Sequence, residues 1–151
     1  MAKTGEQLLE IARHFQLEGV PMQVKTLGDG FINDTFTIET EGDAPRYILQ
    51  RKNTNIFKDI PGMMSNIQAI TSHLKRKIAA AGGDPMRESL TVVPAIDGKL
   101  YHVQDGEYWC VTVFVENSVS YDKADTPSLA ECGGKGIGRF QAMLSDFDQP
   151  L

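Results

Sequence analysis

The chain has 151 residues, of which 41% are hydrophobic and 23% charged, and its formal net charge at neutral pH is −5. This length suits one domain, or a lobe with an extension, and the composition is typical of soluble globular proteins. The charge provides no large basic field, and no apolar run reaches the roughly 20 residues of a membrane span. We therefore expect neither a nucleic-acid partner nor a membrane partner.

The first residues lack the basic and then apolar pattern of a signal peptide. The two cysteines, Cys110 and Cys132, have no metal-ligand spacing. Together these features predict a cytoplasmic protein whose thiols are reduced.

A helix is predicted over residues 4–19. Thr4 and Gln7 fit a capping box at its start, and Gly19 followed by Pro21 ends it. Its apolar positions form one stripe, made of Leu8, Ile11, Ala12 and Phe15.

Three strands are predicted next, over residues 24–27, 31–40 and 46–52. Asp29-Gly30 is a strong hairpin signal between the first two, because both residues tolerate positive φ. In the third strand one face carries Tyr47, Leu49 and Arg51, and the other carries Ile48 and Gln50.

A longer helix follows the polar connection 53–59. Asp59 is its expected cap, and Gly82-Gly83 ends it. Turn signals at Asp97-Gly98 and Asp105-Gly106 then separate strand-like runs and predict a second antiparallel meander, with Pro94 at an edge or a bulge.

Residues 117–127 are polar and turn-rich, which makes them the best linker candidate, and a last helix is predicted from Thr126-Pro127 to about Ser145. This helix contains "ECGGKGIGRF". The run is not a Walker phosphate loop, because Gly136 follows Lys135 and no strand precedes it. We expect a helix whose small residues pack closely against a neighbour.

The stretch "LGDGFINDTFTIET" has two interpretations. Taken alone, it is typical of a tight hairpin. Its glycines would equally let backbone N–H groups approach phosphate oxygens without a Cβ in the way. The cation Arg51, the long helix and the strand that leads into the linker favour the second interpretation, a loop over a nucleotide.

Several segments resemble the N-terminal part of aminoglycoside-phosphotransferase-like kinases, and they are most similar to the N-acetylhexosamine 1-kinase branch. They are "GDGFINDTF", "YILQRKNTNIFKD", "NIQAITSHLKRK", "FVENSVSYD" and "GRFQAMLSDFD", so that the resemblance covers about residues 20–148. It implies an α+β, protein-kinase-like N-lobe of about five antiparallel strands with a packed long helix. Residues 1–116 would form this nucleotide-binding lobe, 117–127 a hinge or linker, and 128–151 the first helix of a C-lobe.

The resemblance also implies a set of ATP-binding residues. Arg51 would be the strand cation that contacts phosphate oxygens. The loop over the phosphates would consist of Gly28, Asp29, Gly30 and Asn33. The hinge, whose backbone would hydrogen-bond adenine, would consist of Phe114, Val115, Glu116 and Asn117.

The chain departs from the family pattern in two ways. No acidic residue lies between Asp59 and Asp84, where the family's helix supplies a glutamate to the strand cation, so Arg51 would bond Asn66 or contact phosphate alone. The family's catalytic and metal-binding aspartates would lie beyond Leu151. We therefore expect no catalytic residue and no metal ligand in this chain, and Mg²⁺ only in a longer parent.

These inferences give two hypotheses. In the first, the chain is the ATP-binding part of a kinase that phosphorylates a small, sugar-like molecule. By itself it would be inactive, and it would form a homodimer through its exposed apolar face. In the second, it is a non-catalytic α+β binding or interaction module that dimerises.

Overall fold

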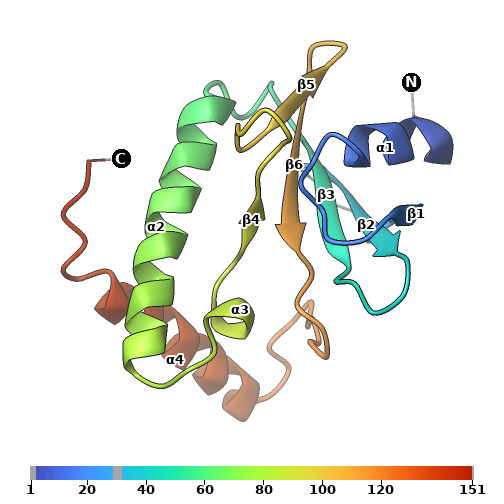
Figure 1. Ribbon diagram of the computed structural model, residues 1–151. Helices are drawn as coiled ribbons and strands as arrows, with labels where there is room; N and C mark the ends of the chain where they lie inside the picture. Colours follow the sequence, from blue (N-terminus) through green and yellow to red (C-terminus); the bar gives the residue numbers. More distant parts are fainter. Residues whose placement is uncertain (1–2, 29–31, 151) are drawn as a thin grey trace. The chain divides into compact units, whose positions relative to one another are not determined.

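The computed structural model describes residues 3–28 and 32–150 (Figure 1). Its contacts divide the chain into two compact units. The first unit extends to Gln68 and resumes over Leu90–Phe114, and the second consists of Ala69–Ser89 and the chain from Val115 onward. The domain bounds expected from the sequence stay a prediction. The first unit ends at Phe114, close to the expected linker. The second unit, however, includes the second half of the long helix, which was expected to belong to the N-terminal lobe.

The first unit is built on an antiparallel sheet. In the described part of the chain its strands are β1 (Pro21–Thr26), β2 (Asp34–Thr40), β3 (Tyr47–Lys52), β4 (Val92–Val93), β5 (His102–Gln104) and β6 (Glu107–Val113). Their order is β1-β2-β3-β6-β4, and β5 also pairs with β6. Because β3 occupies one edge of β6, β4 and β5 share the other edge, and the sheet is five strands wide. The predicted α+β fold is confirmed.

The second group of strands is not the meander that its turn signals predict. β4 pairs with β6, through Val92 opposite Thr112, and not with β5. Pro94 follows β4 directly and has no N–H group to donate, so the strand ends after two residues. The hairpin at Asp105-Gly106 does form, with φ values of 54° and 76°, and it joins β5 to β6.

One face of the sheet is covered by α1 (Gly5–Ala12), which starts with the predicted capping box at Thr4. The helix ends well before Gly19, because the following segment pairs with the chain after β4. The Gln16 N–H donates to the Pro94 carbonyl at 3.0 Å, and Phe15 forms a bridge with Ala95. The buried core on this face comprises Leu8, Ile11, Ala12, Phe15, Ile38, Tyr47, Leu49, Val93, Ala95, Trp109 and Val111.

The opposite face packs against the first half of α2 (Ile60–Ala80), as Figure 1 shows. Ile60 and Met64 lie buried there with Val92 and Cys110. The predicted cap is in place, since the carboxylate of Asp59 accepts the N–H of Gly62 at 2.9 Å. The sheet therefore has an α1 face and an α2 face, and successive residues of each strand alternate between them.

The second unit contains the rest of α2, the unpredicted turn of helix α3 (Pro85–Glu88), and α4 (Pro127–Met143). Thr126 caps α4, as expected, by accepting the N–H of Leu129 at 3.2 Å. The expectation that the small residues of α4 pack against a neighbour is wrong for the described chain. A Cβ at Gly133, Gly134, Gly136 or Gly138 would meet nothing within 4 Å, so these glycines are not in close contact with a neighbouring described segment.

Candidate functional site

The loop from β1 to β2 begins at the end of the sheet where β3 also ends. The N–H of Leu27 donates to the carbonyl of Thr35 at 2.9 Å, in the last described bond before the loop. Gly28 has a φ of 65°, and a Cβ there would meet nothing within 4 Å. The backbone conformation therefore favours glycine at this position, and there is open space beside it. Asp29 and Gly30 lie outside the described residues.

Asn33, at the C-terminal end of this loop, is hydrogen-bonded to the segment after β3. Its side-chain oxygen accepts the N–H of Asn53 at 3.0 Å, and the Asn53 side chain in turn accepts the N–H of Asn55 at 3.0 Å. Phe57 then packs into the core on the α2 face. The N-x-N-x-F pattern therefore closes the connection from β3 to α2 and ties it to the base of the loop.

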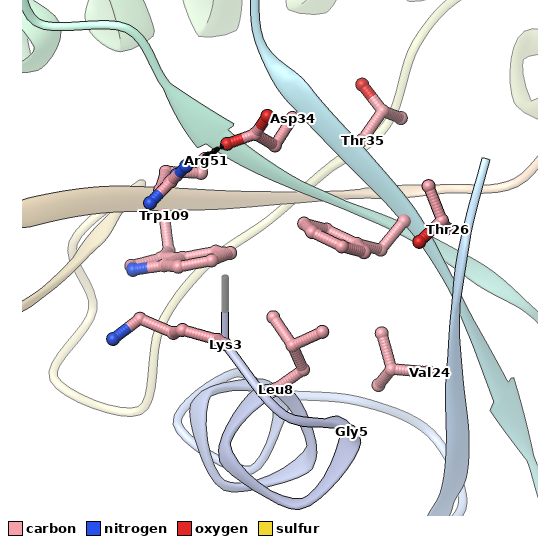
Figure 2. A pocket seen from close by; sticks show the side chains of 10 residues that line it. Lys3, Gly5, Leu8, Val24, Thr26, Asp34, Thr35, Arg51 and Trp109 are labelled. Carbon is pink, nitrogen blue, oxygen red and sulfur yellow. Dashed lines mark hydrogen bonds and ion pairs between the residues drawn. The ribbon is translucent and has the colours of Figure 1, made fainter. Parts of the chain in front are cut away.

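Arg51 lies on the α1 face, at the centre of a cluster of charges. Its Nε donates to the carboxylate of Asp34 at 2.6 Å, and its Nη1 pairs with Glu107. Lys3 reaches the other oxygen of Glu107 at 3.1 Å and Asp105 at 3.2 Å. Figure 2 shows Arg51 joined to Asp34, with Trp109 between Arg51 and Lys3 in that view. Arg51 therefore faces away from α2, and of the two alternatives left by the sequence the hydrogen bond with Asn66 is not formed between these described residues.

The contacts in this cluster favour the ionised forms of Arg51 and Glu107. Burial lowers the pKa of Arg51, but hydrogen bonds to Glu107 and Asp34 outweigh burial and leave this pKa raised. Burial raises the pKa of Glu107, but the hydrogen bonds from Arg51 and Lys3 leave it lowered. The cations of Arg51 and Lys3 are thus matched by three carboxylates, those of Asp34, Asp105 and Glu107. The cluster offers no excess positive charge to an anion.

Lys52 is the other cation at the end of β3, and it lies on the α2 face. Its ammonium donates to the Gln50 side-chain oxygen at 2.7 Å, and the Gln50 amide donates to the Thr35 hydroxyl at 3.1 Å. Burial lowers the pKa of Lys52. Among the described residues, no carboxylate forms an ion pair with Lys52, so its charge is available to an anion on this face.

Two pockets open at this end of the sheet. One, of about 370 Å³, lies on the α1 face between α1 and β1 and is partly apolar, with Leu8, Val24 and Trp109 in its wall (Figure 2). The other, of about 450 Å³, is lined almost entirely by polar groups, including Arg51, Lys52 and the residues 53–55. The polar pocket contains Arg51 and Lys52 together with the carboxylates of Asp34 and Glu107, and of its two cations Lys52 is the one without a carboxylate partner among the described residues.

The predicted hinge residues are divided between the two units. In the first unit, the Phe114 N–H donates to the Arg46 carbonyl at 2.9 Å, and the Arg46 guanidinium lies 4.4 Å from the centre of the Phe114 ring. In the second unit, the carbonyl of Val115 accepts the Ser118 hydroxyl at 2.7 Å, and the carbonyl of Glu116 accepts Arg87 Nη1 at 2.8 Å. Asn117 has a positive φ of 53°.

The structure brings Asn33 to the segment that follows β3, and the role of Gly28, Asn33 and Arg51 around a nucleotide stays a prediction. Sequence reasoning missed Asp34, Glu107 and Lys52. The alternation of β3 held a signal for Lys52, since it lies on the same face as Ile48 and Gln50, opposite Arg51. The partners of Arg51 had no such signal, because they depend on which strands become neighbours.

Within the described ranges 3–28 and 32–150, no group of three or more His, Cys, Asp or Glu side chains is arranged to hold a metal ion. No helix among these residues is long and apolar enough to cross a membrane.

No family model matches the chain. Its fold is similar to that of a spectinomycin phosphotransferase whose crystal structure contains ADP and spectinomycin, with a TM-score of 0.61 and 12% sequence identity. The match covers 99% of this chain and 40% of that chain, so the chain spans less than half the length of the phosphotransferase. At this identity the likeness is one of fold, and the chain has the kinase-like fold that the sequence resemblance implied.

Proposed function

We propose that this chain is the ATP-binding N-terminal part of a small-molecule kinase that transfers a phosphoryl group to a hydroxyl of a sugar-like acceptor. The observation that carries the proposal is the match of almost the whole chain to a phosphotransferase fold, where the solved structure contains a nucleotide and a small-molecule substrate. The sequence resemblance to sugar kinases points to the same reaction class.

The nucleotide phosphates would lie on the α2 face of the sheet, beneath the loop of Gly28, Asp29 and Gly30. Two features of the described residues fit this assignment. The space beside Gly28 is open, and Lys52 presents a cation without a carboxylate partner in the described chain. Binding a phosphate would restore to Lys52 the charge stabilisation that burial removes. We therefore assign the phosphate contact to Lys52.

The sequence assigned that contact to Arg51. Its side chain lies on the α1 face, where Asp34 and Glu107 already neutralise it. A phosphate would have to displace these carboxylates to reach Arg51, whereas Lys52 has no carboxylate partner among the described residues, and this favours Lys52 for the contact. The proposal keeps the backbone of Phe114, Val115, Glu116 and Asn117 as the adenine-binding hinge.

Phosphoryl transfer further needs a metal ion to neutralise the developing charge and a base to orient the acceptor hydroxyl. In our proposal this chain positions the nucleotide, and a C-terminal part supplies the Mg²⁺ ligands and the base. The 151-residue chain produced alone would therefore not turn over ATP.

Produced alone, the chain would also self-associate through α4. No residue of α4 is buried, and the exposed fractions of Ile137 and Phe140 are 64% and 44%. Apolar side chains exposed in this way favour association. Sedimentation at increasing concentration tests this, and a monomer throughout would contradict it.

The activity is tested with the full-length protein that contains this chain. ADP release from Mg-ATP is measured with and without a panel of amino sugars and neutral sugars. We expect release that depends on one class of sugar and that falls in Lys52→Gln but not in Lys99→Gln, a variant at an exposed turn. If no acceptor stimulates ADP release and the protein binds no nucleotide, the chain is instead a binding module.

A further inference from the structure

The base of the glycine loop is held to β3 by two side-chain contacts. Asn33, at the end of the loop, accepts the N–H of Asn53. Asp34, the first residue of β2, pairs with Arg51, which lies directly opposite in the β2–β3 ladder. Both contacts lie where the loop joins the sheet, so they determine how the loop leaves it.

Arg51 connects this junction to two more segments. Its Nε and Nη2 both pair with Asp34, and its Nη1 pairs with Glu107 at the start of β6. Glu107 also contacts Lys3, which comes immediately before the capping box of α1. One guanidinium thus links β2, β3 and β6 at their common end. The planar fork of arginine suits this role, because it bonds two partners in fixed directions.

We infer that Arg51 is a positioning residue for the phosphate-binding loop, acting from the α1 face while the nucleotide lies on the α2 face. The inference rests on the proposed function. Through Asp34, Arg51 holds the first residue of β2, and with it Asn33, against β3 before ATP arrives. A site whose parts are already held in place loses less conformational entropy when it binds its ligand.

A direct contact between Arg51 and phosphate would lead to a different outcome. In that case Asp34 competes with ATP for the guanidinium, and removing the charge of Asp34 should tighten ATP binding. If Arg51 acts through Asp34, the same change releases the base of the loop and weakens ATP binding. The Asp34→Asn variant therefore separates the two roles by the sign of its effect.

The test compares Arg51→Gln, Arg51→Lys and Asp34→Asn in the full-length protein, with Lys99→Gln as the control at an exposed ion pair. KM for ATP, KM for the acceptor and kcat are measured. Amide exchange over residues 27–35 is followed without nucleotide. We expect Arg51→Gln and Asp34→Asn to raise KM for ATP by about tenfold, a scale typical of contacts that support ligand-binding groups. KM for the acceptor should stay unchanged, exchange should be faster, and Arg51→Lys should recover part of the loss.

Tighter ATP binding in Asp34→Asn, or exchange at the control rate in both variants, would overturn the inference. The exchange measurement needs no nucleotide, so it tests whether the Arg51–Asp34 pair holds the base of the loop even if the wild-type protein has no kinase activity. If the wild-type protein is inactive, faster exchange in the variants would still support the role of the Arg51–Asp34 pair at the base of the loop. The absence of activity would then count against the proposed function alone.

Discussion

Arg51 pairs with Asp34, its direct neighbour across the β2–β3 ladder, and not with a residue of α2. This relationship identifies which face of β3 carries which cation. Because side chains alternate along a strand, Arg51 on the α1 face requires Lys52 on the α2 face. The two cations therefore point to opposite faces of β3, although both line the polar pocket at its end.

The pairing itself predicts a measurable coupling. The side chains of Arg51 and Asp34 are 32% and 48% exposed, so solvent screens part of their attraction. We expect a double-mutant cycle with Arg51→Gln and Asp34→Asn to give a coupling free energy of about 0.5–1 kcal/mol. Urea unfolding of the four proteins measures it. Additive effects of the two changes would show that the pair contributes nothing to stability.

Gly19 predicts a local stability effect. Its φ is 78°, and a Cβ there would lie 2.5 Å from the Cβ of Ala44. Gly98 has a similar φ of 84° but open space around it. Gly98→Ala should therefore cost about 1 kcal/mol for backbone strain alone. Gly19→Ala should cost about 2 kcal/mol or more, since overpacking adds to the strain. Equal losses in urea unfolding would mean that the contact with Ala44 relaxes freely.

His102 predicts a loss of stability in mild acid. Its ring stacks on that of His14 with the ring centres 4.0 Å apart, and burial, followed by the proximity of His14, lowers its pKa. In the unfolded chain its pKa returns to about 6.5, so the unfolded state binds a proton more readily. The neutral His102 ring therefore contributes to the free energy of unfolding. This contribution is fully present above the pKa of the unfolded chain, and it is lost as the pH falls through the lower pKa of the folded protein.

The measurement is the free energy of unfolding between about pH 7.5 and pH 5.5, a range that spans the ordinary histidine pKa. The wild-type protein should lose more stability over this range than His102→Gln, which has no titrating ring. Equal pH dependence in the two proteins would rule out His102 as the source.

The two cysteines should differ in reactivity. Cys110 is buried on the α2 face, and burial raises the pKa of its thiol to about 11, whereas Cys132 is exposed. Because the thiolate is the reactive form, a thiol reagent at mildly alkaline pH should label Cys132 at once and Cys110 only after unfolding. The Cys132→Ser variant should then be inert while folded. Rapid labelling of that variant would show that the α2 face opens readily.

The elements that follow from local chemistry were predictable from the sequence. The capping box at Thr4, the cap of α2 at Asp59 and the hairpin at Asp105-Gly106 each depend on a few neighbouring residues, and all three form. The five-strand width of the sheet also agrees with expectation. The two helix caps and the hairpin need only the backbone preferences of residues close together in the chain, whereas the width of the sheet was implied by the family resemblance.

What the sequence did not predict depends on contacts between distant segments. The end of α1 at Ala12 reflects the pairing of Phe15 with Ala95, and no local pattern contains that information. The same holds for Glu107, which meets Arg51 because β6 lies beside β3. The candidate site at the end of β3 stays a prediction, and the environment of each cation there could be described only once the strand order was known.

The most direct test of the central claim is the affinity of the full-length protein for a non-hydrolysable ATP analogue and for adenosine, in wild type, Lys52→Gln and Lys99→Gln. If Lys52 holds the phosphates, Lys52→Gln should weaken binding of the analogue by about 10- to 100-fold, the value of a charged hydrogen bond. Adenosine binding should be unchanged in that variant, and Lys99→Gln should match wild type for both ligands. Wild-type affinity of Lys52→Gln for the ATP analogue would contradict the assignment of the phosphate contact to Lys52.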